Sequence, residues 1–213
     1  MINKDDKIQQ VKNEVINSVL DYAKDNEITN LTVRDISKFT TVTRRTIYRY
    51  FENRNDLLFE VYKRAILDLN DVIKNYRNSA IEQSHNSSDY FNNIHIGLVA
   101  LVNALMDYSH LVKVIVECDS ILKKEENIDI DKKFADVVSS MDYIVGVLRT
   151  AVSNKAINND FDVEQLAFLI YDSFLGTVYR HIITKDKYND RINKESVYKI
   201  VDVYWCYFQS IKL

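Results

Sequence analysis

Basic and aromatic side chains are concentrated between Lys38 and Arg54, in a chain whose net charge is −3. The only acidic residue of this segment is Glu52, and its cations are Lys38, Arg44, Arg45, Arg49 and Arg54. Guanidinium groups bind guanine edges through two hydrogen bonds or pair with phosphates. A tyrosine hydroxyl such as that of Tyr48 is a frequent phosphate donor. The segment therefore indicates DNA binding, with a solvated basic helix face as the alternative interpretation.

Helix start signals divide this segment into two short helices. Thr32 with Asp35 three residues later forms a shortened capping box, which predicts a helix of about two turns through Phe39. Thr43 predicts the N-cap of a second helix that runs to about Phe51. A supporting helix, a tight turn and a second helix together form the pattern of a helix-turn-helix.

On the second helix, the basic and aromatic residues share one broad outward face, which comprises Arg44, Arg45, Tyr48 and Arg49. Thr43 and Thr46 lie near its N-terminus, where free backbone N–H groups attract phosphate. The spacing therefore predicts that this helix presents its charged face to DNA.

The composition of the whole chain predicts an all-α fold. Its 213 residues include no proline and only three glycines, so long helices joined by polar loops are expected. Apolar periodicity predicts a first helix that ends near Asn26 and a long helix that begins near Asp56, and the polar stretch 78–89 marks a loop. Five further helices bring the total to about nine, and they cover residues 90–107, 111–122, 131–153, 162–184 and 193 to the C-terminus.

These elements predict two domains. Residues 1–54 would form the helix-turn-helix DNA-binding domain, and residues 55–213 a helical regulatory and dimerisation domain. The last two helices, at about 162–184 and 193–212, carry more apolar surface than one small bundle would cover. We therefore expect them to bury it against a second copy of the chain; lining an intramolecular core is the alternative.

Several classes of protein are disfavoured by the sequence. The N-terminus, MINKDDKIQQ, is charged, so we expect no signal peptide and a cytoplasmic protein. No apolar stretch approaches the roughly 18 residues that span a bilayer. Cys118 and Cys206 lack CxxC spacing, which favours two reduced core residues of a cytosolic protein over a disulfide framework. No glycine-rich phosphate loop, nucleophile elbow or metal-binding triad is present, so we expect neither an enzyme nor a bound cofactor or metal.

The segment 8–64 resembles the DNA-binding signature of the tetracycline-repressor (TetR) family of bacterial transcriptional regulators. The resemblance is carried by residues 32–36 (TVRDI), 42–43 (VT), 46–51 (TIYRYF) and 54–57 (RNDL). Beyond residue 64 the resemblance is architectural only. It implies a homodimer, most often a repressor, that binds a palindromic operator and is released by a small molecule in the C-terminal domain.

The resemblance also implies roles for individual residues. Thr43, Arg44 and Arg45 would lie at the exposed start of the recognition helix, with Thr46, Tyr48 and Arg49 beside the backbone or base edges. Thr32 would cap the supporting helix near a phosphate, and Arg54 would contact phosphate at the start of the long helix.

The chain departs from the family pattern at two positions. Thr41 replaces the usual glycine of the turn, and a β-branched residue rarely adopts a positive φ. Arg45 replaces a small residue and adds a potential specificity contact.

The C-terminal helices contain polar residues that are candidates for binding an effector: His95, Glu117, Tyr143, Tyr171 and Asp172. A structural or surface role is the alternative for each of them. The alternative for the whole protein is a constitutive or protein-partner-controlled helix-turn-helix protein with no small-molecule inducer. A cavity of several hundred Å³ in the C-terminal domain would favour ligand control, and a packed core would favour the alternative.

Overall fold

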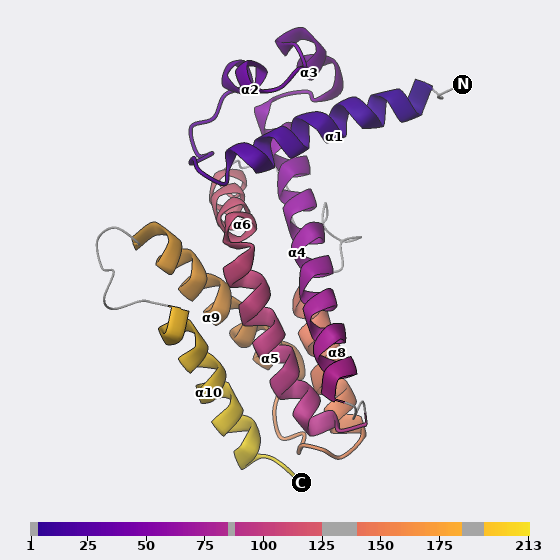
Figure 1. Ribbon diagram of the computed structural model, residues 1–213, viewed down its shortest axis with the longest axis vertical. Helices are drawn as coiled ribbons and strands as arrows, with labels where there is room; N and C mark the ends of the chain where they lie inside the picture. The colour runs from indigo at the N-terminus through magenta and orange to yellow at the C-terminus, as the bar shows by residue number, and fades with distance from the viewer. Residues whose placement is uncertain (1–3, 85–87, 125–139, 185–193) are drawn as a thin grey trace. The chain divides into compact units, whose positions relative to one another are not determined.

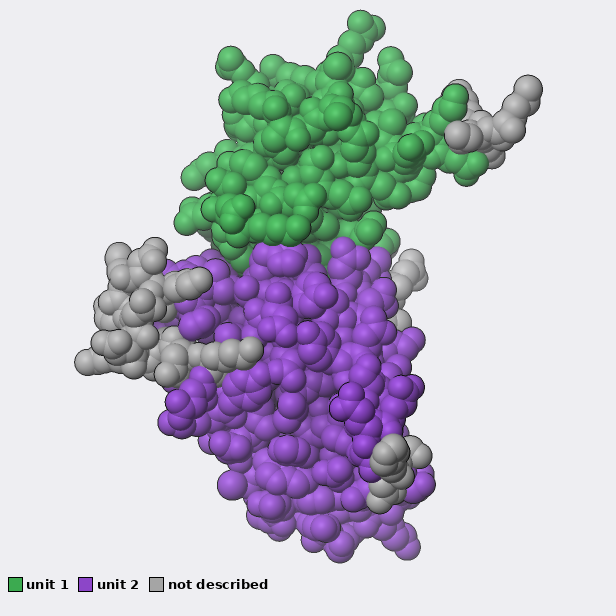
Figure 2. Space-filling view, in the orientation of Figure 1, with its two compact units in different colours: residues 1–66, 113–137 green, residues 67–112, 138–213 purple. Residues whose placement is uncertain are grey.

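The structure is a computed structural model that describes residues 4–84, 88–124, 140–184 and 194–213. Nine helices account for most of these described residues, which confirms the all-α prediction (Figure 1). The first part of the helix predicted over residues 131–153 lies outside the described residues. The chain divides into two compact units, residues 1–66 with 113–137 and residues 67–112 with 138–213 (Figure 2). The functional boundary predicted between residues 54 and 55 stays a prediction.

The first unit contains the helix-turn-helix. Its helices are α1 (Lys4–Tyr22), α2 (Val33–Phe39), α3 (Arg44–Tyr50), the first part of α4 (Arg54–Ser84) and most of α6 (Ser109–Leu122). Its core is fully buried at Val15, Val19, Ile36, Ile47 and Leu58. The rings of Tyr22 and Phe39 stack with centroids 4.5 Å apart. Aliphatic side chains from each helix thus hold the two short helices in place.

Side-chain caps fix where the short helices begin. Thr32 Oγ1 accepts from the Asp35 N–H at 3.2 Å, and the Asp35 carboxylate accepts from the Thr32 N–H at 3.3 Å, which confirms the predicted capping box. Thr43 Oγ1 accepts from the Thr46 N–H at 3.3 Å, as predicted for α3. Asn53 Oδ1 accepts from the Asp56 N–H at 2.9 Å, so α4 begins at Arg54, slightly earlier than predicted.

The turn between α2 and α3 closes without a left-handed residue. Thr40 ends α2 in an extended conformation, with φ −108°, and its N–H donates to the Ile36 carbonyl at 3.2 Å. Among the described non-glycine residues only Lys155 has a positive φ, so Thr41 avoids the conformation that a glycine would favour. The Thr41 hydroxyl instead donates to the carboxylate of Glu14 on α1. This contact gives the β-branched residue a structural role in the turn.

The second unit is a helical bundle. It comprises the remainder of α4 with α5 (Tyr90–Asp107), α8 (Ser140–Ser153), α9 (Val163–Thr184) and α10 (Lys194–Ser210). Helix α5 packs against α8, α9 and α10, and α9 packs against both α8 and α10 (Figure 1). Leu101, Phe174 and Phe208 are among its buried core residues.

The loop predicted from Asn78 to Asp89 is wrong over its first half, because α4 continues through Ser84. The polar sequence concealed Ile81, which lines a cleft together with residues of α5 and α8. The Ser84 hydroxyl donates back to the Ile81 carbonyl at 2.7 Å. Helix α4 therefore continues through part of a stretch whose composition favours a loop.

The two cysteines have contrasting environments. Cys118 is fully buried in the first unit, and its Sγ lies 3.7 Å from the Leu58 carbonyl oxygen. Burial raises the pKa of the Cys118 thiol to about 12. Cys206 is exposed on α10. Both are free thiols, but the prediction that both lie in the core is wrong for Cys206, which is exposed on α10.

Among the described residues, no single helix is long and apolar enough to span a membrane. The pair formed by α5 and α6, which is bent where the two helices meet, passes the same test by length and composition alone.

Candidate nucleic-acid interface

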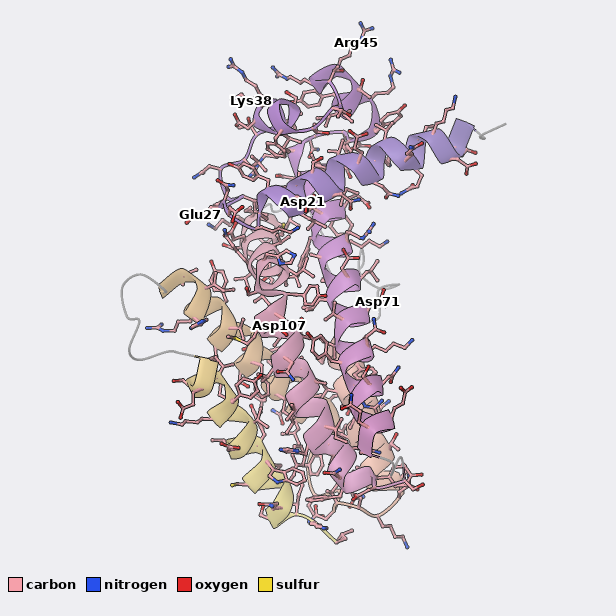
Figure 3. The ribbon with its side chains drawn as sticks, in the orientation of Figure 1. Asp21, Glu27, Lys38, Arg45, Asp71 and Asp107 are labelled. Atoms are coloured by element: carbon pink, nitrogen blue, oxygen red, sulfur yellow. The ribbon has the colours of Figure 1, made fainter. Side chains whose placement is uncertain are left out.

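The exposed face of α3 carries the predicted DNA-binding residues. Arg44, Arg45 and Arg49 are exposed, and Tyr48 is 46% exposed, whereas Ile47 is fully buried. Figure 3 shows Arg45 projecting from α3 away from the ribbon. Because Ile47 anchors the opposite face, the arginine face is available to a ligand. We call this set, Arg44, Arg45, Tyr48 and Arg49, the α3 basic face.

Two contacts order this face and the helix start beneath it. The Arg44 guanidinium carbon lies 5.5 Å from the centroid of the Tyr48 ring, a cation–π contact. The hydroxyls of Thr43 and Thr46 are 3.0 Å apart and can hydrogen-bond to each other. Arg44, Arg45 and Arg49 nevertheless remain exposed.

The charge of Lys38, on α2, is balanced locally. Its Nζ lies 2.7 Å from a carboxylate oxygen of Asp35, and this contact, together with the hydrogen bonds from Thr32, lowers the pKa of Asp35 to about 2. Figure 3 labels Lys38 on this helix. Among the described residues, α3 therefore carries three exposed arginines, whereas on α2 the exposed Arg34 is the one cation outside this ion pair.

Arg54 makes contacts that the sequence did not predict. Its Nε donates to the Leu31 carbonyl at 2.6 Å, and its Nη2 donates to the Thr29 carbonyl at 2.6 Å. A third, longer contact of 3.5 Å joins Nη2 to the Ile28 carbonyl. Arg54 is half-buried and holds the loop that leads into α2. Its predicted contact with phosphate stays a prediction, and the structure adds this supporting role.

Helix α6 supplies two further contacts to the same loop. Lys113 Nζ donates to the Asn26 carbonyl at 2.7 Å, and Glu117 accepts from the Ile28 N–H at 2.8 Å. Glu117 is only 6% exposed, and burial raises the pKa of its carboxyl. These residues lie about 90 positions from the loop in sequence, so no local pattern could have revealed the contacts. We call Arg54, Lys113 and Glu117 the loop clamp.

The structure does not bring the five candidate effector residues into one pocket. Glu117 belongs to the loop clamp of the first unit, and the other four belong to the second. Tyr143 lines an enclosed apolar pocket of about 20 Å³. His95 lines an open cleft of about 360 Å³ beside α4, and its ring contacts that of Trp205 in a tilted arrangement, with centroids 4.7 Å apart. Asp172 is exposed on α9, and Tyr171 is half-buried there. Effector binding by these residues stays a prediction.

Within the described parts of the chain, no group of three or more His, Cys, Asp or Glu side chains is placed to hold a metal ion.

A capped supporting helix, a tight turn and a second helix with an exposed arginine face define a helix-turn-helix DNA-binding protein. Residues 25–61 match the family model described as bacterial regulatory proteins, tetR family. Over this segment the chain is accordingly similar to TetR-family transcriptional regulators, which bind DNA. Among curated proteins, no sequence matches the chain significantly.

Solved structures share the fold along almost the whole chain. A TetR-family transcriptional regulator from Cytophaga hutchinsonii superimposes with a TM-score of 0.70 at 15% identity, over 97% of both chains. The regulator FadR from Bacillus subtilis, solved in complex with stearoyl-CoA, gives 0.62 at 17% identity, over 88% of this chain and 96% of that one. FadR from Thermus thermophilus, a repressor solved with lauroyl-CoA, gives 0.58 at 12% identity, over 90% and 92%. At these identities the likeness concerns the fold.

Proposed function

We propose that this protein is a ligand-responsive repressor that binds a palindromic operator as a homodimer and leaves it when a small molecule occupies the C-terminal domain. The α3 basic face is the observation that carries the proposal. Its three arginines are exposed on a helix that is anchored by Ile47 and follows a capped supporting helix. A short rigid helix of this kind fits the major groove, and its N-terminal residues contact base edges.

Exposed apolar residues on α9 and α10 support dimerisation. Phe168 and Leu169 are just over half exposed, and Ile183, at the far end of α9, is 57% exposed. On α10, Val203 is 67% exposed and Tyr207 39%. Helices α9 and α10 pack against each other, and exposed large apolar side chains gathered on neighbouring helices mark protein interaction sites. A symmetric pairing of α9 and α10 with the same helices of a second copy would bury these side chains and would bring two copies of α3 into one dimer.

Effector control is supported by the fold neighbours and by the cavities of the second unit. The FadR structures from two bacteria contain acyl-CoA molecules. The second unit of this chain has an apolar pocket and open clefts lined by α4, α5 and α8. Stearoyl-CoA and lauroyl-CoA are therefore the first effectors to test.

One observation favours the constitutive alternative. The enclosed apolar pocket has a volume of only about 20 Å³, room for about one water molecule, whereas ligand pockets span hundreds of Å³. An apolar effector must therefore displace side chains of this pocket to enter it. A protein whose pocket never opens would bind DNA without a small-molecule inducer.

The test is selection of bound duplexes from a random DNA library, followed by fluorescence anisotropy on the selected site with and without each acyl-CoA. We expect a palindromic site whose half-sites lie one helical turn apart, one dimer per site, and weaker binding with effector. Selected sites without two-fold symmetry would contradict the dimeric repressor. Affinity unchanged by either acyl-CoA would favour the constitutive alternative.

The proposed release requires a change in the spacing of the two α3 helices. In a DNA-bound dimer they should lie roughly 34–36 Å apart, to enter successive major grooves. Helix α4 contributes residues to both compact units. We therefore propose that a change in the tilt of α4 alters the spacing of the two α3 helices. The measurement is the distance between the α3 helices in crystals of the DNA-bound and effector-bound protein. The same spacing in both crystals would rule out this mechanism of release.

A further inference from the structure

Arg77 is a half-buried cation in the second unit whose bonding capacity is only partly used. Its Nη1 donates to the Tyr143 hydroxyl at 2.9 Å, and its guanidinium carbon lies 5.3 Å from the centroid of the Tyr143 ring. Its Nε is buried and has no hydrogen-bond acceptor among the described residues. A buried donor without an acceptor is costly, so such a group commonly marks a place that a ligand fills.

The guanidinium lines a cleft of about 240 Å³ that contains no carboxylate. The cleft is bounded by α4, α5 and α8, through Arg77, Ile81, Tyr90, Asn93, Val147 and Thr150. Asn93 is buried, with 6% of its surface exposed. In the described parts of the chain, no carboxylate lies within ion-pair distance of Arg77. A cation without a protein counterion in a partly enclosed cleft attracts an anion.

An apolar pocket adjoins this cleft. Val147 lines both cavities, and Tyr143, which accepts the hydrogen bond from Arg77, lines the apolar one. The other lining residues of the apolar pocket are aliphatic or aromatic, apart from Gly97 on α5. A side chain at position 97 would meet no heavy atom of a neighbouring side chain within 4 Å of its Cβ. The two cavities together therefore place a cationic group at one end and an expandable apolar space at the other.

We propose that Arg77, with Asn93 beside it, binds the anionic head of an amphipathic ligand whose apolar chain enters the pocket bounded by Tyr143 and Gly97. The ligand is a medium-length alkyl chain that ends in an anion, either a free carboxylate or an anionic carrier ester. Only the assignment of this ligand as the effector rests on the proposed function; the binding site itself does not. Because the apolar pocket is small, the alkyl chain of the ligand opens it by displacing side chains of the protein. The affinity for the ligand rises about fourfold for each CH₂ that is buried.

The test is isothermal titration calorimetry of the full chain with octanoate, 1-octanol and octanoyl-CoA. We expect octanoate to bind at least tenfold more tightly than 1-octanol, which has the same chain without the charge. Arg77→Gln should weaken octanoate binding at least thirtyfold, because the anion is then left without its cation. The matched control is Arg149→Gln, which removes an exposed α8 arginine that pairs with Glu164 and should leave affinity unchanged.

A second variant tests the apolar half of the site. Gly97→Val adds two methyl groups and a Cβ to the apolar pocket and should abolish the gain in affinity from butyrate to octanoate, while butyrate still competes for the Arg77 cleft. Gly97→Ala, a smaller change that also favours the helix, should reduce that gain only in part. Circular dichroism and the thermal midpoint of each variant verify that it folds.

Each result decides between named possibilities. If octanoate binds but no more tightly than 1-octanol, or if the Arg77→Gln protein binds octanoate and octanoyl-CoA as tightly as the wild-type protein does, the site is overturned. Arg77-dependent binding of octanoate identifies a free acid, and Arg77-dependent binding of octanoyl-CoA alone identifies a carrier ester. If the protein binds octanoate at this site but its affinity for the operator is unchanged, the proposed site is supported and the proposed release by an effector is contradicted. If the protein binds the operator but neither octanoate nor octanoyl-CoA, the proposed site is contradicted and the proposed DNA-binding function is supported.

Discussion

Removal of the Arg54 side chain tests whether the loop clamp supports the helix-turn-helix. Two of its hydrogen bonds, to the carbonyls of Leu31 and Thr29, are 2.6 Å long, and the third, at 3.5 Å, is too long to count fully. A hydrogen bond to a charged group contributes about 1.5–3 kcal/mol. Because Arg54 is half-buried, the lower value applies to each of the two short bonds. Arg54→Ala should therefore lower the free energy of unfolding by about 3 kcal/mol.

The assay is urea unfolding followed by far-UV circular dichroism, with the slope of free energy against urea compared between variants. An unchanged slope with a lower midpoint indicates a loss of stability rather than a change in the unfolded state. Arg54→Lys keeps the charge but replaces a planar fork with a single ammonium, so it should recover less than half of the loss. The matched control is Arg49→Ala, which removes an exposed arginine of α3 and should change stability by less than about 0.5 kcal/mol.

Operator binding by the same variants separates the two roles of Arg54. If Arg54 also holds a phosphate, Arg54→Ala should flatten the dependence of log affinity on log salt by about 0.9. If its role is confined to the loop, affinity falls and the salt dependence is unchanged. A loss of stability below about 1 kcal/mol would refute the clamp, since two charge-assisted hydrogen bonds cannot be that weak in this geometry.

Three further perturbations test other parts of the molecule. Arg44→Ala or Arg45→Ala should each cost about 1–3 kcal/mol of operator affinity and relax base preference at one position, measured by anisotropy on a set of single-base variants. Phe168→Asp combined with Ile183→Asp should convert the dimer to a monomer in sedimentation experiments, because each places a charge in the proposed apolar interface. Burial raises the pKa of Glu117, so the folded state binds its proton more tightly than the unfolded state. Stability should therefore fall as pH rises above about 4.5, and Glu117→Gln, which retains an acceptor for the loop, should flatten the change in urea midpoint between pH 5 and pH 7.

Each of these perturbations has a control or a contradicting outcome. Lys74→Ala, on the exposed side of α4, should leave base preference unchanged, and Leu67→Asp, which alters an exposed leucine of α4, should leave the dimer intact. Asp35, with a pKa of about 2, titrates below the pH range that tests Glu117. Wild-type and Glu117→Gln proteins whose urea midpoints respond identically as pH rises from below 4.5 to 7 would contradict the buried ionisation. Affinity that survives both arginine substitutions would contradict docking through α3.

The parts of this fold that depend on neighbouring residues could be predicted from the sequence. Thr32 with Asp35, and Thr43, act within one helical turn, so the starts of α2 and α3 follow from residue type and spacing. The exposed basic face of α3 follows from the same periodicity. The absence of glycine at Thr41 indicated a turn closed in another way, and the contact with Glu14 supplies that closure.

The parts that depend on distant residues could not be predicted. Lys113 and Glu117 reach a loop about 90 residues away, and neither has a local pattern that marks a clamp. Arg77 lay beside a stretch whose composition favoured a loop, so its place on a continuous α4 and its contact with Tyr143 were missed. The five effector candidates were chosen by residue type among apolar helices, and type alone does not determine which helices face a common cavity.

Because one of the two thiols is buried and the other is exposed, a single label can be attached to the native chain. Maleimides and methanethiosulfonates react with thiolate, and Cys118 is both fully buried and held protonated, with a pKa of about 12. Cys206 is exposed on α10, so one label per chain attaches there without any substitution. In a dimer paired through α9 and α10, Cys206 would lie close to Val203 and Tyr207 at the interface, so the rate at which its thiol is labelled would report how far the partner covers it. Rearrangement of the assembly on adding an operator or octanoate could then be followed in solution, on the unaltered sequence.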